Sequence, residues 1–170
     1  MRPRGNLQGR LGCLTIVLLA ATPAAAQSVA ELQTRFESET NSVHKAKLLE
    51  KLGDAQFAEA RRAEKEGDNN AVDATLEKYR DNVRAALEAL KKQHPDAEKH
   101  SNGYRQLEMH LRKGIRETEE AMLAAPEPYK PPLQLVRADL VAMDEEMIKL
   151  LFPHRPAEQH APALPAEKQP

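Results

Sequence analysis

Hydrophobic residues recur at helical spacing along most of this chain, and the clearest pattern lies between residues 71 and 93. Its apolar positions alternate in steps of four and three: Val72, Leu76, Tyr79, Val83, Ala86 and Leu90. Residues 133–151 repeat this alternation at Leu133, Val136, Leu140, Met143, Met147 and Leu150. Such steps gather the apolar side chains on one face of a helix and are typical of helices that pack side by side at shallow angles. We therefore predict two long amphipathic helices, Ala71–Gln93 and Leu133–Leu151.

Two further helices are predicted upstream. Gln27–Thr40 is a short, moderately amphipathic segment with Val29, Leu32 and Phe36 on one face. A longer helix is expected from about Val43 to Glu66, because Asn41-Ser42 before it is a good N-cap sequence. The turn-forming residues 67–70 (Gly-Asp-Asn-Asn) then end that helix. A turn this tight predicts an antiparallel hairpin with the helix that follows.

A third long segment is expected from Asp96 to about Ala125. Pro95 ends the preceding helix and suits the first turn of this one. Residues 101–103 (Ser-Asn-Gly) are candidate helix breakers, so the secure part of the segment begins at Tyr104. Residues 126–132 contain four prolines and predict a rigid connector that no helix crosses.

Together these segments predict an all-α protein: an up-and-down bundle of three to four long helices with a short N-terminal helix and a disordered C-terminal tail. The composition agrees, because only 4% of the residues are aromatic, there is no Trp, and Gly is limited to seven. Heptad-like seams are also compatible with dimerisation, so a homodimer in which two protomers complete one bundle stays open.

The N-terminus has the features of a secretory signal peptide. Three arginines precede the apolar stretch Leu11–Ala21, which at about 11 residues is too short for a membrane span of about 20. Small residues at 24–26 predict cleavage before Gln27. We therefore divide the chain into a signal peptide (1–26), a helical bundle domain (27–152) and a Pro-rich disordered tail (153–170), and expect a periplasmic or secreted bacterial protein with no membrane span after cleavage.

Removal of the predicted signal peptide changes the chemistry of the chain. It removes Cys13, the single cysteine, so the mature protein would have no thiol for catalysis or redox switching. It also leaves 22 Lys and Arg against 26 Asp and Glu, a net charge of −4, where the full chain has −1. A mildly acidic protein is a poor candidate for binding nucleic acid, which requires a basic surface.

The histidines and methionines were considered as metal or haem ligands. The chain has six histidines: His44, His94, His100, His110, His154 and His160. None belongs to a Glu-x-x-His, His-Glu-x-x-His or Cys-x-x-Cys-His motif, so we predict no metal site and no cofactor. His110 is expected to be a boundary residue capped by water or a carboxylate, and Gly114 to mark a close helix approach. The consecutive acidic residues 144–146 are expected on a solvated helix face and not in a catalytic pair.

The segment from Tyr104 also carries a local basic stripe. Arg105, Arg112 and Arg116 lie at i, i+7 and i+11, close to one helix face, and form the candidate interaction surface. The simpler interpretation is a solvated flank paired with Glu108, Glu119 or Glu120, because such pairs are common on exposed helices.

Several short segments carry a resemblance to a known family: Tyr104–Arg116 (YRQLEMHLRKGIR), Leu150–Pro153 (LLFP) and Lys45–Leu49 (KAKLL), together with Tyr79. Over roughly Val43–Pro153 the chain resembles an uncharacterised family of exported, all-helical bacterial proteins. The resemblance implies a helical fold and an extracytoplasmic location. It implies no activity, cofactor or catalytic residue.

The sequence therefore favours a non-enzymatic exported protein that acts by protein–protein interaction, with an unidentified protein partner, or as an envelope scaffold. A ligand-binding bundle that holds a metal, haem or apolar molecule near His110, Gly114 and Met143 is the alternative, with Met122 and Met147 as further bundle methionines. A periplasmic chaperone is a third hypothesis, which requires an exposed apolar concavity.

Overall fold

The computed structural model describes residues 28–153, so the predicted signal peptide and the predicted tail beyond Pro153 lie outside the described residues. Within this range the chain forms α1 (Val29–Ser38), α2 (Ser42–Glu66), α3 (Asn69–Gln93), α4 (Ser101–Ala124), the short 3-10 helix η1 (Glu127–Tyr129) and α5 (Lys130–Leu151). No strand is present in residues 28–153, and the predicted all-helical class is confirmed. Among these described helices, none is both long enough and apolar enough to cross a lipid bilayer.

The turn between α2 and α3 is built from Gly67 and Asp68. Gly67 has a φ of 75°, in the left-handed region, and its N–H donates to the carbonyl groups of Ala63 and Glu64. The side chain of Asp68 then accepts a hydrogen bond from the N–H of Ala71. A left-handed residue that ends one helix next to a cap that starts another reverses the chain within a few residues.

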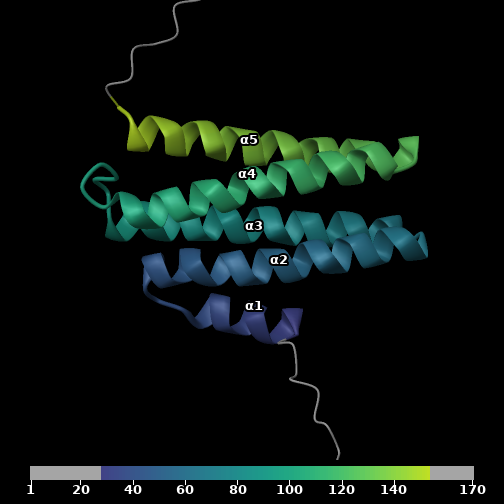
Figure 1. Cartoon of the computed structure of the whole chain (residues 1–170), viewed down its shortest axis with the longest axis horizontal. Coiled ribbons are helices and arrows are strands. Elements are labelled where there is room, and N and C mark those ends of the chain that lie inside the picture. Colours follow the sequence, from purple (N-terminus) through teal and green to yellow (C-terminus); the bar gives the residue numbers. More distant parts are fainter. Residues whose placement is uncertain (1–27, 154–170) are drawn as a thin grey trace, which may run out of the picture.

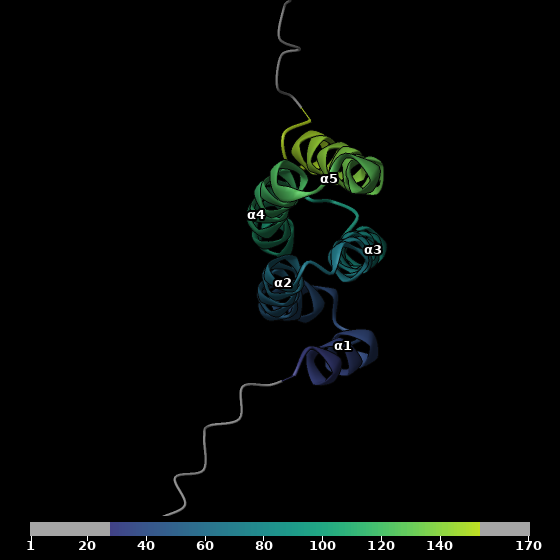
Figure 2. The same ribbon diagram turned by 90° about the vertical axis from the view of Figure 1, so that its right-hand side faces the viewer.

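The four long helices lie side by side, and consecutive helices run in opposite directions (Figure 1). Helix α2 packs against α3, and α4 packs against α5. These two pairs are joined because α4 also packs along α2, while α3 contacts both α4 and α5. The end-on view shows α1 outside this group, against the α2–α3 pair (Figure 2). Helices α2 and α4 therefore run side by side in the same direction.

The apolar seams read from the sequence form the core. All six seam positions of α3 are buried, and in α5 the five from Leu133 to Met147 are buried. At the end of α5 the buried residue is Leu151, which is 7% exposed, and Leu150 is only partly buried. A straight helix has 3.6 residues per turn, so a strict 3.5-residue seam drifts around it, and over two to three heptads the buried position moves by one residue.

Two expected boundaries were wrong. Helix α4 begins at Ser101, so Pro95 does not open it and residues 101–103 lie inside its first turn. Gly103 is accommodated there because it lies against α3, where a Cβ atom would stand 2.6 Å from Cδ2 of Leu90. The proline-rich connector is also shorter than expected, because α5 begins at Lys130 and takes in the last two prolines. Proline is tolerated in a first helical turn, where the backbone N–H needs no partner within the helix.

Candidate functional site

A cluster of three buried aromatic rings lies where α2, α3 and α4 meet. The ring centroids of Phe57 and Tyr79 are 4.6 Å apart, and the ring of His110 stacks on Phe57 at 5.7 Å with an interplanar angle of 11°. The exposed fractions are 1% for Phe57, 0% for Tyr79 and 6% for His110. A histidine and a tyrosine are thus buried between the helices, at positions that apolar side chains usually occupy.

Two glycines in the middle of helices make room for these rings. A Cβ atom on Gly53 of α2 would stand 2.3 Å from Cε1 of His110, and one on Gly114 of α4 would stand 2.3 Å from Cε1 of Tyr79. Glycine inside a helix costs about 1 kcal/mol relative to alanine, so both helices lose stability to admit the rings. Gly114 thus has the packing role that was expected of it, but what lies against it is the Tyr79 side chain and not the backbone of another helix.

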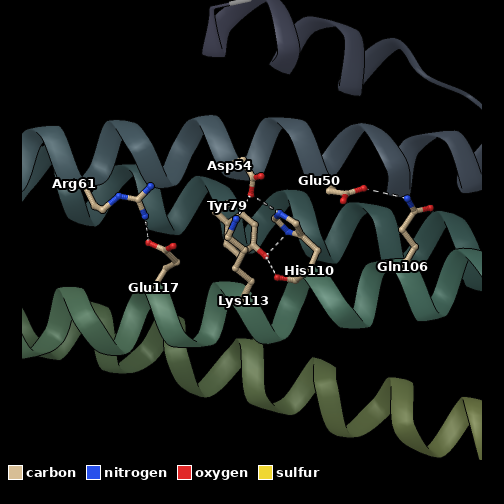
Figure 3. A network of polar contacts seen from close by, with 8 residues as sticks. All are labelled: Glu50, Asp54, Arg61, Tyr79, Gln106, His110, Lys113 and Glu117. Carbon is tan, nitrogen blue, oxygen red and sulfur yellow. Dashed lines mark hydrogen bonds and ion pairs between the residues drawn. The ribbon is translucent and has the colours of Figure 1, made fainter.

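The polar atoms of the cluster satisfy one another (Figure 3). The Tyr79 hydroxyl lies 3.1 Å from Nδ1 of His110 and donates to the His110 backbone carbonyl, also at 3.1 Å. Nε2 of His110 lies 3.2 Å from Oδ1 of Asp54, and Nζ of Lys113 donates to the same oxygen at 2.7 Å. The expectation of a boundary histidine capped by a carboxylate is confirmed, with Asp54 as the carboxylate.

Burial and hydrogen bonding set the charges of this network. Burial lowers the pKa of His110 below its usual 6.5, and the hydrogen bond to Asp54 offsets only part of that effect. Burial raises the pKa of Asp54, but hydrogen bonds from Lys113 and His110 outweigh it and the net shift is downward. Burial raises the pKa of Tyr79, which keeps its hydroxyl protonated. At neutral pH the imidazole of His110 is therefore neutral, with Asp54 beside Nε2 and the Tyr79 hydroxyl beside Nδ1.

Asp54, His110 and Lys113 of this network line an open groove of about 750 Å³ between α2 and α4. The groove is lined by α2 residues between Val43 and Asp54 and by α4 residues between Asn102 and Arg116. Of its two carboxylates, Asp54 is paired with Lys113, whereas Glu50 accepts a hydrogen bond from the neutral amide of Gln106 at 3.2 Å and has no cation within 4.0 Å among the described residues. The polar contacts along this interface continue to an ion pair between Arg61 and Glu117 (Figure 3).

Three basic side chains of the groove are left without an acidic partner. Lys47, Arg105 and Arg116 line it, and no carboxylate of the described residues lies within 4.0 Å of their charged nitrogens. Met109 lies between them on α4 and is 70% exposed. The groove therefore combines unneutralised positive charge with an exposed apolar side chain.

The predicted arginine stripe is divided between two grooves. Arg116 lines only the α2–α4 groove and Arg112 only a second groove of about 340 Å³ between α4 and α5, while Arg105 borders both. Arg112 is also neutralised, with Nε 2.5 Å from a Glu108 carboxylate oxygen and 3.6 Å from Asp144. The predicted pairing with Glu108 is thus confirmed.

Of the other expected partners of the stripe, Glu119 binds elsewhere. It accepts a hydrogen bond from Nε of Arg137 of α5 at 2.7 Å. Of the three alternatives named from the sequence, Glu108 is therefore the one that pairs with the stripe, and Glu119 pairs with α5.

Sequence reasoning missed three residues of this surface. Lys47 belongs to α2, and it shares a groove with Arg105 only because α2 and α4 pack side by side. Met109 is exposed although it adjoins the apolar stripe of α4, and Phe152, 51% exposed, borders the α4–α5 groove beyond the end of α5. The sequence did hold one signal for Met109: it is an apolar residue at a helix position that faces away from the apolar stripe.

A smaller cavity of about 180 Å³ lies elsewhere, between α2, α3 and α4. Its apolar lining includes Phe57, Ala60, Val72, Leu76 and Ala121. The described residues 28–153 hold no group of three or more His, Cys, Asp or Glu side chains placed to bind a metal ion. His154 and His160 lie outside the described residues.

The chain was compared with models of known protein families, with curated protein sequences and with solved structures, and none of the three comparisons gave a match.

Proposed function

We propose that this protein is an exported, non-catalytic binding protein that acts by contact with a partner protein, or as an envelope scaffold, through the surface around α4. The single observation that carries the proposal is the α2–α4 groove, in which Lys47, Arg105 and Arg116 lack acidic partners around the exposed Met109. Charged groups that are not neutralised within a protein favour and steer association with a partner of opposite charge.

A binding role agrees with the state of His110, the best catalytic candidate among the described residues. General base catalysis needs a nitrogen that can reach a substrate. Here Nε2 lies against Asp54 and Nδ1 against the buried Tyr79 hydroxyl, and His110 is only 6% exposed although it borders the groove. We therefore propose that the network fixes the packing of α2 against α4, as part of an up-and-down bundle, and thereby the shape of the groove.

Export rests on the N-terminal sequence and is tested directly by mass. The protein purified from the periplasm or the medium should begin at Gln27. A chain that retains residues 1–26 in the cytoplasm would contradict this part of the proposal.

The partner is tested by photocrosslinking in the organism that encodes the protein. A photoreactive phenylalanine analogue replaces Met109, which is 70% exposed, and in a matched control it replaces Leu135, which is 66% exposed on α5. We expect a discrete protein adduct from position 109 and none from position 135. An adduct of twice the chain mass would identify a homodimer, and the absence of any adduct specific to position 109 would refute the surface as an interaction site.

A second candidate function is the binding of a small apolar molecule, and the cavity lined by Phe57, Val72, Leu76 and Ala121 favours it. The cavity has a volume of about 180 Å³, and its apolar side chains face charged ones from Arg61, Glu64, Lys65, Glu117 and Glu120. Binding of a small aromatic molecule that is lost on replacement of Ala121 by Leu would support this function, and unchanged binding would reject the cavity as its site. We place a chaperone role lower, because the α2–α4 groove is lined mostly by polar and charged side chains.

A further inference from the structure

We propose that the α2–α4 groove binds an acidic amphipathic helix of another exported protein. This inference rests on the proposed binding function and adds the chemistry of the partner. It is drawn from the charges, the shape and the exposed apolar residue of the groove.

The charges call for an acidic occupant. Lys47 on one wall and Arg105 and Arg116 on the other have no carboxylate within 4.0 Å among residues 28–153. Of the two carboxylates of the groove, Asp54 is paired with Lys113, whereas Glu50 is bound only by the neutral amide of Gln106 and keeps its charge, so the basic groups without a partner outnumber the acidic ones by three to one. This positive surface occurs on a chain whose total formal charge is −1. Carboxylates on a partner would therefore meet basic groups that the protein itself leaves unpaired.

The shape calls for a helix. Two long helices that lie side by side leave a straight furrow between them, into which the side chains of a third helix can pack. On α4 the lining runs from Asn102 to Arg116, which at 1.5 Å per residue is a length of about 21 Å. That length suits a partner helix of about 14 residues, or four turns.

The apolar contribution comes from Met109. It is 70% exposed between Arg105 and Lys113, and a flexible methionine packs well against varied apolar side chains. The groove is concave, and a flat lipid surface would reach its rim more readily than its floor. The observations therefore favour a helical peptide over an anionic membrane as the occupant.

The test measures binding of the full mature protein to a designed 14-residue peptide that has apolar residues at i, i+3, i+4 and i+7 and glutamates on the flanks. Two control peptides carry the same residues in scrambled order or lysine in place of glutamate. We expect the acidic amphipathic peptide to bind with a dissociation constant in the micromolar range, more weakly at high salt, and the two controls to bind at least about tenfold more weakly.

The protein variants test the location. Arg105→Glu with Arg116→Glu reverses two charges of the groove and should weaken binding at least about tenfold, since opposite charges become like charges. Lys92→Glu with Lys149→Glu makes the same change in net charge at exposed positions outside the groove and should change binding less than about twofold. Circular dichroism of both variants checks that the fold is retained.

Three results would overturn the inference: no binding of the acidic peptide, equal loss of binding in both charge variants, or binding to anionic phospholipid vesicles without binding to the peptide. Its failure is separable from that of the proposed function. A protein adduct at position 109 without peptide binding would leave the binding function standing and reject the acidic helix as its partner.

Discussion

Replacement of Gly114 by alanine tests whether the aromatic cluster determines how closely α3 and α4 approach. The added Cβ atom would lie 2.3 Å from Cε1, 2.5 Å from the hydroxyl oxygen and 2.6 Å from Cζ of Tyr79. The Tyr79 ring cannot move away freely, because it is fully buried and packs against Phe57 at a centroid distance of 4.6 Å. Either the helices separate or the ring shifts and its hydrogen bonds to His110 break.

The expected magnitude combines three terms. Overpacking of a core costs about 1–3 kcal/mol, and leaving a buried polar group unpaired costs about 1–3 kcal/mol. Alanine in place of glycine returns about 1 kcal/mol through its higher helix propensity. We therefore expect Gly114→Ala to lower the free energy of unfolding by about 3 kcal/mol, measured by urea denaturation followed by circular dichroism at 222 nm.

A double-mutant cycle provides the control. In a Tyr79→Leu background the ring atoms that meet the Cβ atom are gone, so adding Gly114→Ala should stabilise that variant by about 1 kcal/mol. The sign of the Gly114→Ala effect therefore reverses between the two backgrounds. If Gly114→Ala is neutral or stabilising in the wild-type background, the absence of a side chain at residue 114 is not needed to accommodate the Tyr79 ring.

Three other predictions concern the same network and the α2–α3 turn. Tyr79→Phe removes the hydroxyl that donates to the His110 carbonyl and lies beside Nδ1 of the same residue. The variant should lose about 1–3 kcal/mol of unfolding free energy with an unchanged circular dichroism spectrum. No loss would show that water takes over the hydroxyl's role. Burial lowers the pKa of His110 in the folded state, so the unfolded chain binds the proton more readily and the free energy of unfolding should fall as the pH drops below about 6.5. In His110→Gln the fall between pH 7.5 and pH 5.5 should be smaller. An identical fall in the variant would contradict His110 as its origin. Gly67→Ala places a Cβ atom in open space, but on a residue with a φ of 75°. The left-handed backbone alone should therefore lower the free energy of unfolding by about 1–2 kcal/mol. A variant with an unchanged melting temperature would contradict this strain.

The local chemistry of the helices could be read from the sequence. The alternating seam of α3 and the turn at Gly67 and Asp68 gave the right elements, because helix periodicity and capping depend on residues only a few positions apart. The start of α4 could not be read in the same way. Ser101–Gly103 looks like a break, and it is helical because Gly103 lies against Leu90 of α3.

The candidate site was only half visible in the sequence. Arg105 and Arg116 were identified from their spacing on one helix, and His110 from its place beside an apolar stripe. Their surroundings come from other helices: Lys47 lies on α2, 58 positions before Arg105, and Tyr79 lies on α3. The sequence also predicted one arginine stripe, whereas in the structure Arg112 is paired with Glu108 of its own helix and with Asp144 of α5 and lies outside the α2–α4 groove that Arg105 and Arg116 line.

The sequence by itself therefore determined the secondary structure and the apolar faces, because backbone hydrogen bonding and helical periodicity act over a few residues. Only the tertiary structure decided which basic side chains stay unneutralised and which polar side chains are buried together. Ion pairing and burial depend on distances between helices, and those distances are set by how side chains such as Tyr79 fit against Gly53 and Gly114.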